Sequence, residues 1–471
     1  MTTGPEVSLE EILRAREERA DRQRELLRRE TALISFSMNI AGPVKYTPLI
    51  RRGFLEGCAA LESALGQACL TVLERERSFR PTGCEGFWLL RADPMELKRL
   101  TVEIEDTHPL GRLFDLDVLG EDGRHISRTG LGAPDRECLV CGAPGRACAS
   151  RRLHPVEEIR RKIREMLEDF FLKEDLEYIA SLCGRALLYE VCTTPKPGLV
   201  DCENNGSHRD MNLFHFLDST AELFPFFRDC AEIGYRTRLA PPARAFEELR
   251  TAGKAAERRM LAATGGVNTH KGAIFSMGAV CGAMGRLRRE EGLCRNPAVI
   301  LDTTAALVRE AAEGDLAAIR RGTAVTAGGE QYVRYGLTGV RGQAAGGFPA
   351  VRKIGLPVLR QGIRAGKSLP EAGTAALLHL IAAVEDTNLI ARGGYSLQQE
   401  AAARLRALLA ETPFPDAGCL RDLNTWFVER NLSPGGCADL LAITYLLYFT
   451  EEAGGDTHCV EQLFQTAESM R

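Results

Sequence analysis

The feature that most constrains the fold of this chain is a change in the pattern of its apolar residues near residue 172. Before this point, several segments alternate apolar and polar residues, which is typical of β strands with one buried face. After it, apolar residues recur at helical spacing, and glycine-rich joints interrupt the pattern. The chain, at 471 residues, is also too long for a single hydrophobic core. The sequence therefore predicts a multidomain protein, with an N-terminal α+β domain built on an antiparallel sheet (residues 1–172) and a C-terminal all-α domain (residues 173–471).

The predicted sheet is assigned to three segments. LTVEIEDT (residues 100–107) alternates apolar and acidic residues, and GRLFDLDVLG (residues 111–120) continues the alternation. A GEDG turn then leads to RHISR (residues 124–128), as in a β-hairpin. Pro155 is expected to begin a helix that ends near Phe171, because proline is favoured at the first position of a helix.

Composition and charge argue against several classes of partner. The net charge is −4 and the pI is about 6.2, so the chain has no basic field with which to hold nucleic acid. Its most apolar runs, such as DLLAITYLLYF, are too short to span a bilayer. The N-terminus has no apolar signal segment, and 15 cysteines without one indicate reduced thiols rather than a disulfide framework. We therefore expect a cytoplasmic protein that binds neither nucleic acid nor membranes.

Two aspartates lie inside the apolar segment GRLFDLDV. Asp115 and Asp117 are two residues apart, so on a strand their side chains share one face and form a natural clamp for Mg²⁺. Glu103 or Glu105 could supply a third carboxylate from the neighbouring predicted strand, and Arg112 could bind a phosphate through two hydrogen bonds. Such a group suits displacement at phosphorus, where metal ions neutralise charge on the attacking and leaving oxygens. The alternative is an edge strand whose solvent face is acidic.

A cluster of candidate zinc ligands follows in the segment CLVCGAPGRACASRRLH. Cys138 and Cys141 have the C-x₂-C spacing of a metal knuckle, and Cys148 and His154 could complete a tetrahedral Zn²⁺ site. The sequence has no second knuckle, so a loop with incidental, reduced thiols is the alternative.

Polar residues gather at four joints of the predicted helical domain. In the first joint, TTPKPGLVD, two prolines stiffen the backbone around Lys196, so that less entropy is lost when the amine binds an anion. Glycines lie next to amides, cations and carboxylates at these joints, and the helix N-termini there could bind phosphate. The candidate residues are Lys196, Asp201, Asn204, Asn205 and His208 at the first joint, Asn268, His270 and Lys271 at the second, Glu385, Asp386, Asn388 and Arg392 at the third, and Gly435 and Gly436 at the fourth.

Together the four joints predict one cavity for a ligand that carries a polyphosphate and a sugar. Mg²⁺ could be held there by Asp201, Glu385 or Asp386, since carboxylate oxygens are its preferred protein ligands. The chain has no Walker or Rossmann pattern, so the common nucleotide-binding folds are not supported.

Long segments of the chain resemble two known families. EVCTTPKPGLVDCENNGSHRDM, GGVNTHKGAIFSMG, EDTNLIARGG and NLSPGGCADLLA look like the triphosphoribosyl-dephospho-CoA synthase family, over most of residues 173–471. EILRAREERADRQRELL and GRLFDLDVLG, with GRHISRTGLGAPDRECLVCGAPGRACASRRLH, resemble the holo-acyl-carrier-protein synthase of citrate lyase, over about residues 8–170. The fused pair resembles the bifunctional proteins that make and attach the prosthetic group of citrate lyase.

This resemblance implies two consecutive transferase reactions. The helical domain would join ATP and 3'-dephospho-CoA: the 2'-hydroxyl of the dephospho-CoA ribose attacks C1' of the ribose of ATP, and adenine leaves. The product, 2'-(5''-triphosphoribosyl)-3'-dephospho-CoA, keeps the triphosphate. The α+β domain would then transfer this product to a serine of the acyl carrier protein (gamma subunit) of citrate lyase, with release of pyrophosphate.

The resemblance also implies roles for residues of the helical domain. Glycosyl transfer passes through a state with positive charge on the sugar, so Asp201 or Asp386 would stabilise that charge or hold Mg²⁺. His208 or His270 would act as the base toward the attacking hydroxyl. Phosphates would be held by Lys196, Lys271 and Arg392.

In the α+β domain, Asp115 and Asp117 would hold Mg²⁺ on the triphosphate, with Arg112 on its oxygens. One position departs from the expected family pattern. In VRGQAAGGFP, Gln343 stands where this family is expected more often to have glutamate. If that carboxylate were the base, this chain would be weakly active or would use another group.

Two alternatives to this function come from other classes. A related synthase serves malonate decarboxylase, and the citrate-lyase-like N-terminal domain is the feature that separates the two. A non-catalytic, CoA-binding scaffold with a zinc-stabilised N-terminal domain would bind zinc tightly and would release no adenine from ATP.

Overall fold

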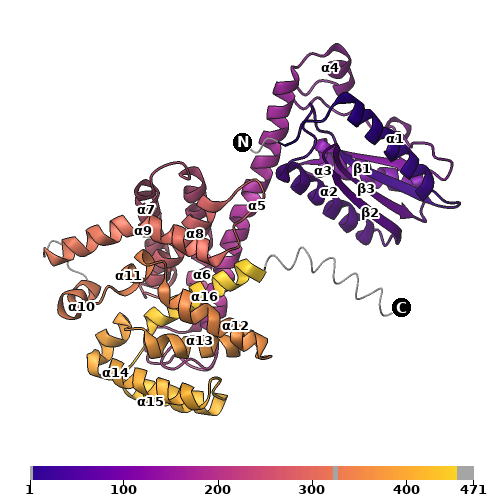
Figure 1. The fold of residues 1–471 in the computed structure, drawn as a ribbon. Helices are drawn as coiled ribbons and strands as arrows, with labels where there is room; N and C mark the ends of the chain where they lie inside the picture. The colour runs from indigo at the N-terminus through magenta and orange to yellow at the C-terminus, as the bar shows by residue number, and fades with distance from the viewer. Residues whose placement is uncertain (1–3, 322–326, 453–471) are drawn as a thin grey trace. The chain divides into compact units, whose positions relative to one another are not determined.

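The computed structural model describes residues 4–321 and 327–452, and the chain divides into two compact units, residues 1–174 and 175–471 (Figure 1). The first unit contains a small antiparallel sheet with helices, and the described part of the second unit is helical. The predicted fold class, a multidomain protein with an α+β and an all-α domain, is confirmed.

The first unit is built on a four-stranded antiparallel sheet of order β2-β3-β1-β4. Its elements, in chain order, are α1 (Leu9–Leu26), β1 (Ala32–Met38), α2 (Pro48–Gln67), β2 (Val72–Arg80), β3 (Gly83–Leu90), α3 (Pro94–Thr107), a 3₁₀ turn (Gly111–Leu113), β4 (Phe114–Leu119), a second 3₁₀ turn (Thr129–Leu131), α4 (Gly145–Arg151) and the first part of α5 (Val156–Cys192).

The two faces of this sheet have different chemistry. On one face, side chains such as Phe36, Trp88 and Leu116 pack with α2, α3 and the start of α5 to form the main core. On the other face, a small apolar cluster joins the sheet to α1, and the rest of that face is polar. On this polar part, Asp115 of β4 is exposed and Asp117 is half-buried, so both carboxylates can be reached by a ligand.

The strand predicted at residues 100–107 is wrong, because these residues form the end of helix α3. Asp93 accepts a hydrogen bond from Met95 N–H (3.2 Å) and Pro94 occupies the first helical position, so the helix begins well before the alternating segment. The buried positions of α3 follow helical spacing, so Val102 and Ile104 both reach the core although they look alternate in a short window.

Other expected elements also differ from the structure. RHISR (residues 124–128) makes only an isolated bridge, between Leu119 and His125. Strands β1, β2 and β3 lie outside the three predicted segments. The helix expected to end near Phe171 instead runs as α5 to Cys192. It belongs to both units: Ile163, Leu167 and Phe171 pack in the core of the first.

The second unit is a bundle of helices around buried, small-residue-rich α8 and α16. Besides the end of α5 it contains α6 (Leu213–Arg236), α7 (Pro242–Ala263), α8 (Lys271–Leu287), α9 (Pro297–Arg320), α10 (Ala327–Tyr335), α11 (Gly339–Ala345), a π-helical turn (Val351–Gly355), α12 (Leu356–Arg364), α13 (Leu369–Ala383), α14 (Thr387–Glu411), α15 (Ala417–Glu429) and α16 (Gly435–Glu452).

Helices α6 and α8 approach each other closely enough to touch through their backbones. A Cβ atom on Gly234 would lie 1.9 Å from the carbonyl oxygen of Gly282, and one on Gly285 would lie 1.9 Å from that of Ala231. Only glycine fits at such contacts. These contacts lie near the C-terminal end of α8, whose other end carries residues of the second predicted joint.

No single helix in the described ranges is both long and apolar enough to cross a bilayer. Helices α13 and α14 pass such a test only as a pair, on length and composition, and they bend by 55° where they meet.

Candidate active sites

The second unit contains a cavity of about 1180 Å³ to which all four predicted joints contribute. Pockets for small ligands usually measure about 300–1,000 Å³, so this one has room for more than one nucleotide-sized group. Of the residues chosen from the sequence, those that line it are Lys196, His208, Asn268, His270, Lys271, Glu385, Asp386, Asn388, Arg392, Gly435 and Gly436.

Lys196 lies at the wall of this cavity in an almost fully buried ion pair. Its Nζ donates to Glu190 Oε1 at 2.5 Å and to the Glu190 carbonyl oxygen at 2.7 Å. Its side chain is 1% exposed, and that of Glu190 is 6% exposed. A buried charge requires a partner, and Glu190 at the end of α5 supplies it. The amine is therefore held in one position beside the cavity.

Three of the residues chosen from the sequence do not line the cavity. Asp201 is buried, and its carboxylate accepts hydrogen bonds from the backbone N–H groups of Lys196 (2.9 Å), Glu203 (2.8 Å) and Asn204 (2.9 Å). The Asn204 side chain accepts a bond from Gly206 N–H (2.8 Å), and Asn205 is exposed. The side chains of Asp201 and Asn204 therefore hold the turn that carries Lys196.

His208 and Arg392 form a hydrogen-bonded pair at the rim of the cavity. His208 Nε2 lies 2.8 Å from the Ser433 hydroxyl, and Arg392 Nη2 lies 3.1 Å from His208 Nδ1. Burial, followed by the charge of Arg392, lowers the pKa of His208 to about 4. The imidazole is therefore neutral at physiological pH. Arg392 also donates to the Ser207 carbonyl oxygen (2.8 Å), which ties two joints together.

His270 is buried just before α8 and faces the cavity with one nitrogen unused. Its Nδ1 lies 2.7 Å from the Ser219 hydroxyl, whereas Nε2 is buried without a hydrogen-bond partner among the described residues. Burial, then the charge of Lys196, lowers the pKa of His270 to about 3. A neutral imidazole with a free nitrogen in a ligand cavity can accept or donate a proton.

Asp386 connects the third and fourth joints. Its Oδ1 accepts from the N–H groups of Asn388 (2.8 Å) and Leu389 (3.2 Å) at the start of α14, and its Oδ2 accepts from Cys437 N–H (2.8 Å) in α16. Burial raises the pKa of Asp386. A Cβ on Gly436 would lie 3.1 Å from Asp386 Oδ2, so this glycine makes room for the carboxylate.

The other predicted residues are more exposed. Lys271, at the first position of α8, pairs with Glu257, and Asn268 accepts from Lys271 N–H at 3.2 Å. Glu385 accepts from the Tyr395 hydroxyl at 2.6 Å. The Gln343 side chain accepts from Ala350 N–H at 3.3 Å and also lines the cavity.

Five further charged residues of the cavity were not chosen from the sequence: Glu190, Arg341, Lys353, Arg406 and Asp439. Asp439 makes no hydrogen bond or ion pair within the described residues. Burial, then the charges of Glu190 and Asp386, raises its pKa well above the ordinary value. Glu190 and Asp439 fall inside the motif segments, but they lie within helices α5 and α16. The residues chosen from the sequence were those at the joints between helices, so these two were missed. Gly272 gave no signal either, yet a Cβ there would lie 1.8 Å from Asp439 Oδ2.

In the first unit, Asp115 and Asp117 share one face of β4, as their spacing predicted. They pair with Ser37 and Ser35 of β1, on the polar part of the sheet face that α1 partly covers. Partial desolvation, then the Asp117 carboxylate, raises the pKa of Asp115. His125, not chosen from the sequence, lies with Nδ1 3.8 Å from Asp117 Oδ1.

Arginines surround the free edge of β4. Arg136 donates to the Gly111 carbonyl oxygen (2.8 Å), and its Nη1 lies 3.9 Å from Glu105 Oε1. Glu105 also accepts from Leu116 N–H (3.1 Å) and pairs with Arg128 (3.2 Å), so it protects the strand edge instead of joining the aspartates. Arg112 donates to the Glu137 carbonyl oxygen, and burial, then the nearby charge of Arg136, lowers its pKa.

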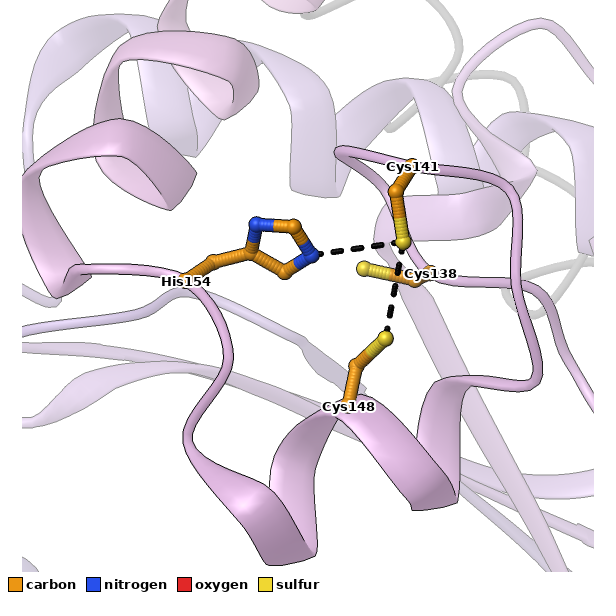
Figure 2. Close-up of side chains that lie close together, drawn as sticks. All are labelled: Cys138, Cys141, Cys148 and His154. Atoms are coloured by element: carbon orange, nitrogen blue, oxygen red, sulfur yellow. Dashed lines mark hydrogen bonds between the residues drawn. The ribbon is translucent and has the colours of Figure 1, made fainter.

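The four candidate zinc ligands also come together in the first unit, and Figure 2 shows their side chains converging.

Comparisons with known proteins match both units. Residues 176–458 match the family described as ATP:dephospho-CoA triphosphoribosyl transferase, and residues 7–170 match apo-citrate lyase phosphoribosyl-dephospho-CoA transferase. Over 456 residues the chain is 37% identical to "Protein CitXG" of Haemophilus influenzae, which covers 94% of this chain and 96% of the relative. The chain belongs to the CitXG family.

Other relatives agree with this assignment. Protein CitXG of Leuconostoc mesenteroides subsp. cremoris is 33% identical over 465 residues, 94% of this chain and 97% of its own length. The 2-(5''-triphosphoribosyl)-3'-dephosphocoenzyme-A synthase of Pectobacterium atrosepticum is 41% identical over 289 residues, 60% of this chain and 93% of its own.

As a CitXG protein, the chain is a bifunctional transferase. The unit at residues 1–174 is called here the transferase half, and the unit at residues 175–471 the synthase half. The cavity belongs to the synthase half, and the Asp115/Asp117 face belongs to the transferase half.

Proposed function

We propose that the synthase half binds ATP and 3'-dephospho-CoA together in the 1180 Å³ cavity and joins their riboses with release of adenine. The observation that carries this proposal is the mixed charge of the lining. Six cations (Lys196, Lys271, Arg341, Lys353, Arg392 and Arg406) suit the phosphates, and four carboxylates (Glu190, Glu385, Asp386 and Asp439) suit a reacting sugar that becomes positively charged.

Among the carboxylates, Asp439 is the best candidate to act on the reacting sugar. Asp386 is occupied by three backbone N–H groups, Glu190 by Lys196, and Glu385 by Tyr395. Within the described residues Asp439 has no such partner. Burial, then the charges of Glu190 and Asp386, raises its pKa, and positive charge on the reacting sugar would favour its ionised form. We assign it to charge stabilisation at C1'.

His270 is the best candidate for the base. The amide of Gln343 cannot accept the proton of the attacking hydroxyl, whereas His270 is neutral and its Nε2 has no hydrogen-bond partner in the part of the chain that the structure describes. His208 is less suited, because both of its nitrogens already have partners.

The predicted Mg²⁺ sites fit only a metal that arrives with the substrate phosphates. Within the described residues, neither site gathers three or more carboxylate or imidazole ligands. Mg²⁺ on a nucleotide usually takes one or two carboxylates and keeps several waters, so Asp115 with Asp117 would suffice in the transferase half. When bound, it would neutralise charge on the triphosphate.

For the transferase half, we propose that the face with Asp115, Asp117 and the arginines of the β4 edge receives the triphosphate of the intermediate. A serine of the citrate lyase acyl carrier protein then takes the prosthetic group, and pyrophosphate leaves. We assign His125, whose Nδ1 lies 3.8 Å from Asp117 Oδ1, to take the serine proton.

In the experiment, the protein is incubated with ATP, Mg²⁺ and 3'-dephospho-CoA, and the free adenine is measured. Carrier protein is then added, and its mass is measured. The carrier protein of malonate decarboxylase serves as the comparison substrate.

Asp439→Asn should lower the rate of adenine release by at least about 100-fold, a loss typical of a removed electrostatic group, without changing the thermal midpoint. The matched control is Asp422→Asn on α15, an exposed site outside the cavity. Wild-type adenine release from Asp439→Asn would refute the assignment.

A further inference from the structure

We propose that Cys138, Cys141, Cys148 and His154 form a structural Zn²⁺ site that holds the arginine-bearing segment of the transferase half against β4. The four ligand atoms lie within 4.8 Å of one another. Cys141 Sγ lies 3.5 Å from Cys148 Sγ and 3.3 Å from His154 Nε2 (Figure 2). A tetrahedral zinc ion with Zn–S of about 2.3 Å and Zn–N of about 2.0–2.1 Å places its ligand atoms about 3.6–3.8 Å apart.

The backbone around the first two cysteines has the form of a metal knuckle. Cys138 N–H donates to the Ala143 carbonyl oxygen (2.7 Å), and Gly142 N–H donates to that of Cys138 (3.1 Å). Gly142 has a φ of +72°, which favours glycine, and Val140 N–H points to Cys138 Sγ at 3.5 Å. The turn thus presents both thiols to one point.

The outer partner of the histidine is also in place. With Nε2 toward the thiols, His154 turns Nδ1 toward Glu158 Oε2, 3.5 Å away on α5. A carboxylate on the far nitrogen of a zinc-bound histidine fixes its orientation and strengthens it as a ligand. Three thiolates and one imidazole in a closed set favour zinc in a structural role over magnesium or calcium.

The segment around the cluster has little else to hold it. Between residues 121 and 155, Cys148 is the one buried residue, and regular structure is limited to a 3₁₀ turn, isolated bridges and the short α4. So little burial cannot balance the entropy of ordering such a segment, and a metal site is a common substitute for a core.

The proposed zinc site is linked to the transferase site through adjacent residues. Arg136 and Glu137 directly precede Cys138, and they bind Gly111 and Arg112 in the 3₁₀ turn that leads into β4 and Asp115. This link, which rests on the proposed function of the transferase half, predicts that zinc supports carrier-protein modification and is not needed for adenine release.

The test uses the full chain, without a metal-binding tag, and three readouts. Metal analysis should find about one zinc ion per chain in the wild type and at most about 0.1 in Cys148→Ser. The control variant Cys69→Ser, which replaces an exposed cysteine of the same unit, should bind as much zinc as the wild type. The Co²⁺-substituted wild type should show intense visible bands of a tetrahedral thiolate site. Cys148→Ser should lose at least about tenfold in carrier-protein modification, as expected when a supporting shell of a site is lost, and keep adenine release.

If Cys148→Ser is insoluble, zinc released from the wild type by a mercurial reagent gives the same count. The site is refuted if the wild type binds no zinc after dialysis against equimolar Zn²⁺, or if Cys148→Ser binds as much zinc as the wild type. A disulfide between Cys141 and Cys148 in protein isolated without reductant would also refute it. If Cys148→Ser binds no zinc but modifies carrier protein normally, only the link to the transferase site is refuted. The zinc content itself does not depend on whether either reaction has been assigned correctly.

Discussion

At the scale of single residues, the synthase cavity depends on a buried ion pair whose partners are close in sequence. Lys196 and Glu190 are both nearly inaccessible, and Asp201 holds the turn that brings the amine back to the end of α5. The sequence pointed to Lys196 because of its flanking prolines. It gave no reason to choose Glu190, whose role depends on where α5 ends.

Removing one charge of this pair should be costly. Lys196→Met leaves Glu190 buried without its partner, so we expect the synthase half to lose about 3–5 kcal/mol of unfolding free energy. The double variant Glu190→Gln/Lys196→Met should recover most of that loss but release no adenine. Urea unfolding measures the first effect, with Lys254→Met, an exposed site on α7, as the control. Equal stability of the single and double variants would contradict this account of the pair.

His270 should make the stability of the synthase half depend on pH. Its folded pKa of about 3 lies below the value of about 6.5 expected in the unfolded chain. The unfolded chain therefore binds more protons between these values, and stability falls as pH decreases through this window. Between pH 7 and pH 5, His270 should account for about 2 kcal/mol of loss, which His270→Gln should remove. Urea midpoints at the two pH values measure this, and an unchanged pH dependence in the variant would refute the assignment.

At the scale of elements, helix packing positions the ligand groups that sequence patterns alone did not reveal. Gly272, in the first turn of α8, leaves the space that Asp439 of α16 occupies. The contact joins two helices far apart in the chain, so no local spacing reports it.

Substitution of this glycine tests the contact. In Gly272→Ala the new methyl group would lie 1.8 Å from Asp439 Oδ2 and must displace it. We expect at least about a tenfold fall in adenine release, since small misplacements of a reacting group cost that much or more. Gly253→Ala on α7, whose nearest atom would be 3.7 Å away, is the control and should be neutral or slightly stabilising. Equal rates for the two variants would show that the position of Asp439 does not matter.

The elements also show where sequence patterns were insufficient. The strand at β4 was predicted because Phe114, Leu116 and Val118 alternate strictly with polar residues. The segment at residues 100–107 alternates as well, but it is the end of helix α3. Asp93, the residue that caps this helix, lies before the segment, so the alternation alone does not reveal the helix. Asp201 was chosen as a ligand for its charge, whereas its carboxylate binds the backbone of its own turn.

At the scale of the whole molecule, the two halves carry separate candidate sites, each made from the residues of its own half. The family motifs made the function and the two-part fold predictable, and most of the predicted polar residues of the synthase half do line one cavity. The places of Glu190, Asp439 and several cations in that cavity depend on how helices from distant segments meet, which single-sequence patterns do not specify.

The most direct test of two separate sites is a single reaction with Asp115→Asn, in which ATP, Mg²⁺, 3'-dephospho-CoA and apo acyl carrier protein are all present. Free adenine and the mass of the carrier protein are measured in the same sample. The account predicts wild-type adenine release and an unmodified carrier protein. Two results would contradict it: the loss of both adenine release and carrier-protein modification, or a fully modified carrier protein.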